Sequence, residues 1–408
     1  MRNPRAYPLL VVVLASLSYL VACEQKKAPA PTQDAGTAAG TAATGGRILI
    51  GHVASLTGEQ ATFGDSTDKG IKLAIAEANA KGGVKGKQID VKTYDDQGKP
   101  DEAATTATRL IVQDKVSVLL GEVASTRSLA MAPIADANHV PMITPSSTNP
   151  KVTKVEGKAR PYVFRVCFID PFQGTVMAKF ARETLKLGKV AVLRDVGSDY
   201  SVGLADYFLT KFKELGGQLV DDQSYKDTDS DFRAQLTAIK AKNPDGIYVP
   251  GYYTHVGLIA RQARELGIKV PLMGGDGWDS PKLFEIGGKA LEGSYFSNHY
   301  SPEDPSPRIQ DFVRTYKERY KAVPDGLAAT GYDAARIAIE AMKAAPVLSG
   351  EAIRDAIAAT KDYPGVTGVI SIDADHNAVK PAVVLQIKDG EGKYVATVQP
   401  DAPAPAAK

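Results

Sequence analysis

The feature that most constrains the fold is an order of strand and helix patterns that occurs twice along the chain. Strand candidates begin near Gln88, Ser117 and Pro141, and again near Gln218, Asp245 and Val270. Corresponding starts lie about 129 residues apart, which indicates two structurally similar halves. Because strands alternate with helices in both halves, we expect an α/β fold with two doubly wound, mainly parallel sheets covered on both faces.

The segment after residue 300 departs from this order. Helix patterns near 306–321, 327–344 and 350–360 precede strand patterns near 366–372, 382–388 and 393–398. We expect this segment to complete one or both halves, so that two or three chain crossings form a hinge between Rossmann-like lobes. In the second half, Ser201 is predicted to cap a helix that ends at Gly216-Gly217.

The first residues, 1–22, are predicted to be an export signal. Arg2 and Arg5 precede an apolar run from Leu9 to Val21, which is shorter than the ~20 residues that span a bilayer. The run ends in Leu20-Val21-Ala22-Cys23, which resembles the lipobox of bacterial lipoproteins. That resemblance implies removal of the signal and lipidation of Cys23. The alternative is an ordinary signal peptide followed by a chance cysteine.

Two further segments lack apolar periodicity. Residues 23–46 comprise the lipidated Cys23 and, after it, a stretch rich in Ala, Thr, Pro, Gly and Lys, which predicts a flexible tether. Residues 400–408 are predicted to be a disordered tail. The folded part is therefore expected to span about 47–399.

Charge and cysteine content exclude several classes of protein. The chain has 49 Lys plus Arg against 47 Asp plus Glu, which argues against a nucleic-acid binder because such proteins carry a large basic excess. Two cysteines cannot build a disulfide scaffold. Once Cys23 is lipidated, Cys167 has no partner, and we expect it to be a buried, inert thiol.

Ligands of doubly wound sheets bind beyond the carboxyl ends of the strands, so the loops there are the candidate site. The loops of the first half are rich in small hydroxyl residues, among them Ser125 and 146–148. Those of the second half carry aromatic residues and one acid, Asp276. Taken singly, such residues are usually caps, turn formers or packing. Taken together, hydroxyl groups for a carboxylate and an acid for an ammonium predict a zwitterion held between two lobes.

We find no pattern for catalysis. The chain lacks a Gly-x-Ser-x-Gly elbow, a His-Glu-x-x-His motif and a phosphate-binding Gly-Lys-Ser/Thr loop. The acidic run Asp227-x-Asp229-x-Asp231 fails as a calcium loop because Phe232 replaces the required Gly. Asp95-Asp96 is predicted to form a turn or cap. The five histidines are predicted to have surface or packing roles: His52, His139, His255, His299 and His376. We therefore expect no enzyme, no metal and no cofactor.

Several motifs together resemble the leucine/isoleucine/valine-binding proteins. They are Gly51-His-Val-Ala-Ser-Leu-Thr-Gly58, Gly64-Asp65, Asn79-Ala-Lys-Gly-Gly83, Tyr94-Asp-Asp96, Met142-Ile-Thr-Pro145, Gly251-Tyr252 and Met273-Gly274. Members of this family are extracytoplasmic substrate-binding components of ABC transporters. The resemblance covers essentially all of 47–399 and implies the type I periplasmic-binding-protein, or Venus-flytrap, fold. It also implies lobe 1 at 47–169 and 300–376, and lobe 2 at 170–299 and 377–399.

The resemblance further implies roles for individual residues. The carboxylate-binding serine of the family falls on Ser125. The segment whose backbone and threonine hydroxyl contact carboxylate and ammonium falls on Ser146-Ser147-Thr148. The acid that pairs with the ammonium falls on Asp276, where the branched-chain binders usually carry Glu.

The walls of the side-chain pocket follow in the same way. The resemblance places aromatic walls at Phe63, Tyr200 and Tyr252, and Phe63 replaces a Tyr of the family. Trp278, two residues after the acid, is expected to fill part of the side-chain pocket. Gln97 and Ala124 occupy the positions of a disulfide found in some members, so that bond is absent.

These inferences define a functional hypothesis. We expect an exported lipoprotein, anchored on the periplasmic side of a bacterial envelope, that binds a branched-chain amino acid and delivers it to an ABC permease. A monomer without nucleic-acid partners is expected. The alternatives are a sensory or regulatory lipoprotein of the same fold that binds another small amino acid or amide, and an amide hydrolase.

Overall fold

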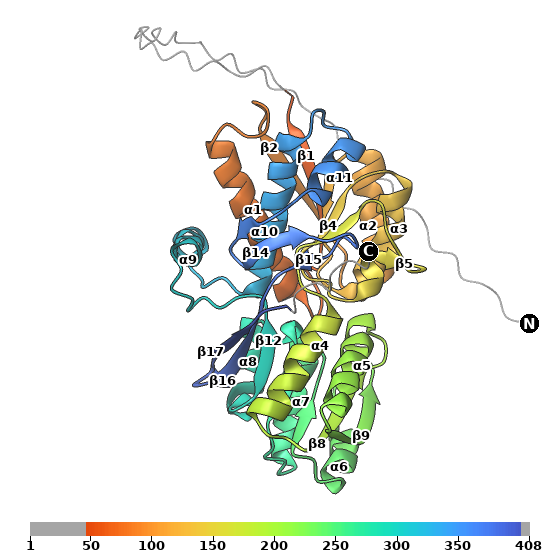
Figure 1. Cartoon of the computed structure of the whole chain (residues 1–408), viewed down its shortest axis with the longest axis vertical. Coiled ribbons are helices and arrows are strands. Elements are labelled where there is room, and N and C mark those ends of the chain that lie inside the picture. Colours follow the sequence, from red (N-terminus) through yellow and green to blue (C-terminus); the bar gives the residue numbers. More distant parts are fainter. Residues whose placement is uncertain (1–45, 401–408) are drawn as a thin grey trace, which may run out of the picture. The chain divides into compact units, whose positions relative to one another are not determined.

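The computed structural model describes residues 46–400, in which two main sheets carry the fold (Figure 1). The first sheet has the order β2 (Ile89–Asp95), β1 (Ile48–Ala54), β3 (Val118–Leu120), β4 (Met142–Thr144) and β7 (Val163–Arg165). The second has the order β17 (Glu391–Val398), β16 (Ala382–Lys388), β12 (Tyr295–Asn298), β11 (Leu272–Gly274), β10 (Gly246–Tyr248), β8 (Lys189–Asp195) and β9 (Gln218–Tyr225). The lipidation and signal predictions for 1–23 lie outside the described residues.

Smaller strands and α-helices accompany the two main sheets among the described residues. Two strands, β5 (Lys154–Val155) and β6 (Lys158–Ala159), form a hairpin, and β13 (Tyr363–Gly365), β14 (Gly368–Ile372) and β15 (Ala378–Val379) form a small sheet. The helices are α1 (Ala61–Ala80), α2 (Pro100–Thr108), α3 (Ser125–Ala137), α4 (Asp170–Lys179), α5 (Asp199–Glu214), α6 (Arg233–Ala241), α7 (Tyr253–Glu265), α8 (Pro281–Gly287), α9 (Pro307–Tyr320), α10 (Gly326–Ala344) and α11 (Gly350–Ala358).

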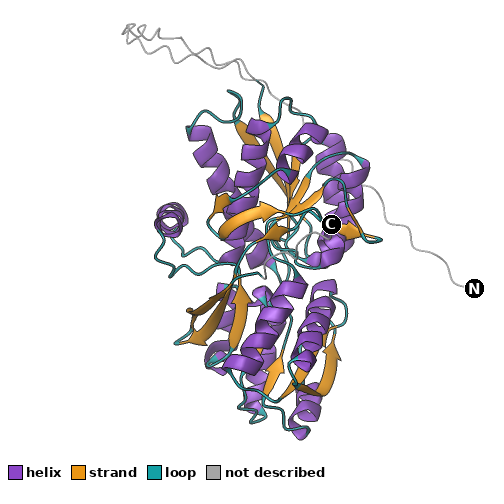
Figure 2. Cartoon of the chain, in the orientation of Figure 1, coloured by secondary structure: helices purple, strands orange, loops and turns teal. Residues whose placement is uncertain are grey.

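Alternate residues of the first sheet enter two different hydrophobic cores. Val118 and Leu120 of β3 pack in a core with α1, α10 and α11, whereas Leu119 packs in a second core with α2 and α3. Successive side chains of a strand point to opposite faces, so a continuous apolar run requires helices on both sides. Helices therefore flank this sheet on both faces (Figure 2).

The second sheet repeats this arrangement. Val190 and Val192 of β8 pack against α4 and α5, and Ala191 and Leu193 pack against α6 and α7. The prediction of two doubly wound, mainly parallel sheets is confirmed. All pairs of the first sheet are parallel, and in the second only the pairs of β16 are antiparallel.

The antiparallel pair β16 and β17 is joined by a tight turn. Asp389 and Gly390 have φ of 55° and 76°, the left-handed backbone that two-residue hairpin turns require. The Asp-Gly pair tolerates this backbone, which returns the chain beside β16.

One helix start differs from the prediction. Helix α5 begins at Asp199, and the Ser198 hydroxyl, not that of Ser201, accepts a hydrogen bond from a free backbone N–H, that of Ser201 at 3.2 Å. The Ser201 hydroxyl instead accepts from the Asp195 N–H at 2.9 Å, at the end of β8. The cap is Ser198, three residues before Ser201, because the Ser201 hydroxyl is already bonded to the Asp195 N–H at the end of β8.

The chain passes between the parts built on the two sheets in three segments. These are residues 166–169 between β7 and α4, 299–306 between β12 and α9, and 380–381 between β15 and β16. No helix within 46–400 has both the length and the apolar character that crossing a bilayer demands.

Candidate functional site

A small cavity lies among the loops that follow the strands of the two sheets. It brings together six residues predicted from the sequence: Phe63, Ser125, Ser146, Tyr200, Tyr252 and Asp276. Three further residues complete its lining: Val123, Gly277 and Leu327. The carboxyl ends of both sheets therefore contribute to one site, as expected for doubly wound folds.

One side of the cavity is polar and built from hydroxyl groups. Ser125 is the first residue of α3, where backbone N–H groups lack partners within the helix and favour an anion. Its hydroxyl accepts from the Asn149 N–H at 3.2 Å, and the Ser146 hydroxyl donates to the Val123 carbonyl at 3.0 Å. Both serines are buried. This side suits a carboxylate.

The loop after β11 contributes Asp276, which is buried and held by three donors. Oδ1 accepts from Gln173 Nε2 at 2.7 Å and from the Tyr200 hydroxyl at 2.9 Å. Oδ2 lies 2.9 Å from Nε2 of His299. A carboxylate offers about four acceptor positions, so these contacts leave one for a further donor. An ammonium group would fill it with a charge-assisted hydrogen bond.

Two of the residues that hold Asp276 were missed from the sequence. Gln173 lies one turn into α4, and no motif marked it. His299 was predicted to have a surface or packing role; it is buried and contacts the candidate ligand acid. Their position became apparent only from the folded chain.

Aromatic rings close the cavity beside Asp276. Tyr200 and Tyr252 stack with centroids 5.1 Å apart, and Phe63 meets Tyr252 edge-on at 5.8 Å. Glycines make this packing possible. A Cβ at Gly275 would lie 2.5 Å from the Tyr200 hydroxyl oxygen, and one at Gly277 would lie 2.8 Å from the Gly251 carbonyl oxygen.

The remaining wall is aliphatic. Val123 follows β3, and Leu327 lies in the first turn of α10. Both are buried and share one hydrophobic cluster with Phe63. An apolar wall of this kind suits a hydrocarbon side chain.

Three predicted residues are not among those that line the cavity. The Ser147 hydroxyl donates to the Glu122 carbonyl at 3.0 Å. Thr148 is buried near the Asp170 carboxyl; burial raises the pKa of that carboxyl to about 8, and Thr148 opposes the rise. The Trp278 indole donates to the Val249 carbonyl at 2.9 Å within the hydrophobic core. The ligand roles assigned to these three residues stay predictions.

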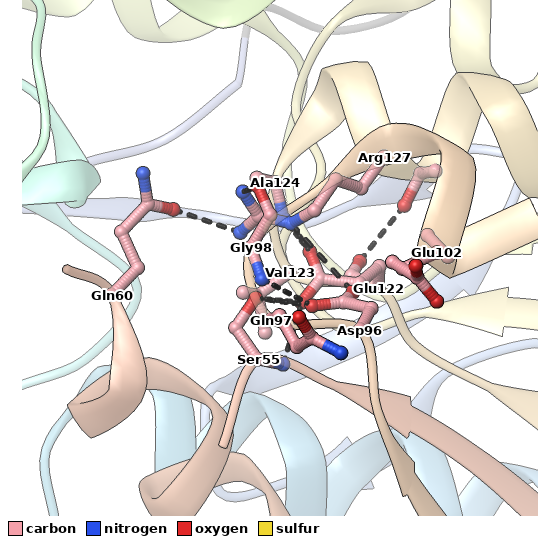
Figure 3. Close-up of polar contacts among 12 residues, drawn as sticks. Ser55, Gln60, Asp96, Gln97, Gly98, Glu102, Glu122, Val123, Ala124 and Arg127 are labelled. Atoms are coloured by element: carbon pink, nitrogen blue, oxygen red, sulfur yellow. Dashed lines mark hydrogen bonds and ion pairs between the residues drawn. The ribbon is translucent and has the colours of Figure 1, made fainter. Parts of the chain in front are cut away.

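A buried ion cluster of Glu122, Arg127 and Asp96 lies at the loop that leads through Val123 and Ala124 to Ser125 (Figure 3). Glu122 accepts from Arg127 Nε at 2.8 Å and from the Ala124 N–H at 2.7 Å through Oε2. Its other oxygen accepts from the Ser55 hydroxyl at 3.2 Å, and that hydroxyl also lies 2.7 Å from Asp96 Oδ1. Gln60 accepts from the far end of the Arg127 guanidinium at 2.8 Å.

The cluster fixes the loop that carries Val123 and Ser125. The Glu122 carbonyl accepts from the hydroxyl groups of Ser128, Thr144 and Ser147. Burial and the neighbouring Glu122 charge raise the pKa of Asp96 to about 7, and Arg127 opposes this rise. Asp96 also accepts from the Gly98 N–H at 2.9 Å, the predicted turn role, but its contact with the ion cluster was not predicted.

Other residues considered in the sequence lie apart from the cavity lining. His52 contacts Asp68, and His255 contacts the Asp227 carbonyl. Cys167 is a buried free cysteine, and burial raises the pKa of its thiol to about 12, so the prediction of a buried thiol is confirmed. Among residues 46–400, no group of three or more His, Cys, Asp or Glu side chains could hold a metal ion.

The chain is similar to known periplasmic binding proteins over most of its length. The sequence profile described as periplasmic binding protein matches residues 47–392. Leu/Ile/Val-binding protein homolog 2 of Brucella abortus is 33% identical over 351 residues, which are 85% of this chain and 92% of that protein.

Two solved structures are similar over nearly the same span. The leucine binding protein LivK of Thermotoga maritima has a TM-score of 0.83 and 43% identity, and the match covers 86% of this chain and 99% of that one. The branched-chain amino acid transporter substrate binding protein LivJ of Streptococcus pneumoniae, in complex with isoleucine, has a TM-score of 0.82 and 36% identity. That match covers 87% of this chain and 100% of the other.

Proposed function

This chain belongs to the periplasmic binding protein family, among the substrate-binding proteins of branched-chain amino acid ABC transporters, and from that premise we propose that its cavity binds a branched-chain amino acid for delivery to a permease. The fold is the type I periplasmic-binding-protein fold. The relatives bind substrates, and the chain is a binding protein rather than an enzyme.

One observation carries the choice of ligand. The cavity combines the N-terminus of α3 and the serines on one side with the buried Asp276 on another, and its remaining wall is hydrocarbon. A zwitterion with an aliphatic side chain is the small molecule that meets all three demands. The isoleucine held by the S. pneumoniae relative has this chemistry and supports the proposal.

Binding would also connect the two parts of the chain. Hydrogen bonds already join them near the cavity, such as Thr62 to Ser280 at 2.8 Å and the Asn149 side chain to the Asp199 carbonyl at 2.7 Å. A ligand that contacts Ser125 from one part and Asp276 from the other would favour the arrangement in which both are close. Only such differential binding can drive closure.

A binding screen tests the ligand. We expect leucine, isoleucine or valine to raise the melting temperature, because a ligand stabilises the folded state by RT ln(1+[L]/Kd). Calorimetry then compares leucine with 4-methylpentanoate, which lacks the ammonium, and with 3-methylbutylamine, which lacks the carboxylate. Asp276→Ala should weaken leucine binding by at least roughly tenfold, since the ammonium loses its charged partner. An exposed acid, Asp231, provides the control variant Asp231→Ala.

Two outcomes would contradict this assignment. Unchanged leucine affinity in Asp276→Ala would remove that acid from the site. Binding of 4-methylpentanoate as tight as that of leucine would show that the cavity does not recognise an ammonium.

The lipid anchor and the permease complete the proposal. The lipobox-like sequence that ends at Cys23 supports export and lipidation. In a bacterial host, the wild-type protein should sediment with membranes and Cys23→Ser should not; equal fractionation would contradict the anchor. Deleting the gene should lower leucine uptake if the protein serves a permease, whereas unchanged uptake would favour the sensory alternative.

A further inference from the structure

We propose that His299 is a positioning residue for the ligand's ammonium group, because it holds Oδ2 of Asp276 from a chain crossing and so links the hinge to ligand recognition. This inference rests on the proposed function, since it assigns the ammonium to Asp276. It adds a residue outside the cavity lining to the machinery of binding.

The donors on Asp276 are divided unevenly between its two carboxylate oxygens. Oδ1 accepts from both Gln173 and Tyr200, so its two acceptor positions are filled. Oδ2 accepts from His299 at 2.9 Å and keeps one position. The ammonium would therefore share Oδ2 with His299. The direction of the remaining acceptor position depends on the orientation that the imidazole imposes on the carboxylate.

His299 lies where two of the chain crossings meet. The residue opens the crossing at 299–306, and only 1% of its surface is exposed. Its ring lies against that of Phe168, with centroids 4.1 Å apart, and Phe168 belongs to the crossing at 166–169. Its backbone N–H donates to Asn298 Oδ1 at 2.7 Å. Two of the three crossings thus fix the imidazole that holds Asp276.

The charge state of the His299 imidazole also bears on ammonium binding. Burial lowers the pKa of His299, although Asp276 opposes this, so the ring is neutral near pH 7. A carboxylate can only accept, which assigns the proton to Nε2. A neutral donor orients Asp276 without cancelling its charge, and that charge remains available to the ammonium. An arginine or a lysine in the same place would compete with the ligand.

The third crossing carries a cation, Lys380, that makes no hydrogen bond to Asp276. Lys380 lies at 380–381, and burial lowers the pKa of its ammonium to about 8, against the opposing effects of Asp333, Cys167 and Asp276. Its Nζ is buried and makes no hydrogen bond within the described residues. The charge of Asp333 raises the pKa of Lys380 more than the charge of Asp276 does. Lys380 therefore does not replace the ligand as the partner of Asp276.

The test separates positioning from mere packing with two variants. His299→Phe keeps an aromatic ring against Phe168 but removes the donor, and His299→Gln keeps an N–H donor without the ring. Calorimetry measures leucine and, at millimolar concentration, 4-methylpentanoate for each variant. Another buried histidine, His255 on α7, contacts a backbone carbonyl and supplies the control His255→Gln.

We expect His299→Phe to lose at least roughly tenfold in leucine affinity, with little change for 4-methylpentanoate, because only leucine carries the ammonium. His299→Gln should recover much of that loss, and His255→Gln should bind as the wild type does. Equal losses for both ligands would show a structural role and overturn the proposal. So would unchanged leucine affinity in His299→Phe.

Failure of the proposed function would look different. The wild-type protein itself would then bind neither leucine, isoleucine nor valine. In that case the same comparison uses the amine found by the screen and its deaminated form. If no amine bound the wild-type protein, both the proposed function and the role of His299 would be overturned.

Discussion

Arg127 Nε lies 2.8 Å from Glu122 Oε2, and both side chains are buried beneath the loop that carries Ser125. The same guanidinium lies 3.8 Å from Asp96 Oδ2. One cation therefore serves two buried acids, and it also donates to Gln60. Such a cluster is costly to assemble but more costly to break, because each partner alone would be an uncompensated buried charge.

Arg127→Met should therefore destabilise the protein by about 3–5 kcal/mol, since Glu122 and Asp96 lose their cation. Urea denaturation measures the change in unfolding free energy. The control is Arg314→Met, because Arg314 pairs with Asp311 and Glu318 in an exposed cluster. That variant should lose less than about 1 kcal/mol. Equal losses in the two variants would contradict a structural role for the buried cluster.

The serine side of the cavity gives a second prediction. Ser125→Ala should weaken amino-acid binding by about 1.5–3 kcal/mol, because one charge-assisted hydrogen bond to the carboxylate is lost while the helix N-terminus remains. Calorimetry at constant pH measures the affinity. Thr106→Ala is a suitable control, since that hydroxyl bonds only the backbone of α2. If Ser125→Ala bound as tightly as the wild-type protein, the carboxylate would lie elsewhere.

Asp96 gives a prediction about pH. Its pKa is about 7 in the folded protein, above the usual value, because burial and Glu122 disfavour the charge. The folded state then binds more protons than the unfolded state between about pH 4 and pH 7, so stability falls as pH rises through this window and levels off above it. Asp96→Asn removes that proton difference.

The comparison is between pH 5 and pH 8. The wild-type protein should lose about 2 kcal/mol more of its unfolding free energy than Asp96→Asn over this range. Urea denaturation at both pH values measures the difference, and other buried acids such as Asp325 contribute equally to both proteins. Parallel pH profiles for the two proteins would show that Asp96 does not titrate in this window.

The secondary structure was largely predictable because its signals are local. The strand expected near 382–388 is β16, Ala382–Lys388, and the helix expected near 327–344 is α10, Gly326–Ala344. Apolar periodicity and turn residues are contained within each segment. The Ser201 cap was wrong because Ser198 and Ser201 are both hydroxyl residues near one helix start, and only the contact with Asp195 distinguishes them.

The candidate site was predictable only where its residues follow strands. Asp276 was found in this way, since it follows β11 and lines the cavity. Its partner Gln173 is separated from it by 103 residues and His299 by 23, and no spacing rule connects them. Trp278 was singled out because it lies close to Asp276 in the sequence, in the same short helical turn. It is not among the residues that line the cavity, because positions two apart in such a turn face different sides.

Leu327 is the cavity residue least visible in the sequence, because α10 lies in the return segment, yet it gives a direct test of ligand size. Leu327→Ala removes three carbon atoms from the aliphatic wall, so the cavity should accept a larger side chain. Each additional CH₂ that the ligand buries contributes about 0.8 kcal/mol. The variant should lose affinity for valine and gain affinity for phenylalanine relative to the wild-type protein.

Calorimetric titrations with valine, leucine and phenylalanine measure the order of affinities. Leu209→Ala, on the buried face of α5, is the control for general loss of packing, and it should leave that order unchanged. If the order were the same in Leu327→Ala and the wild-type protein, the ligand side chain would not contact α10.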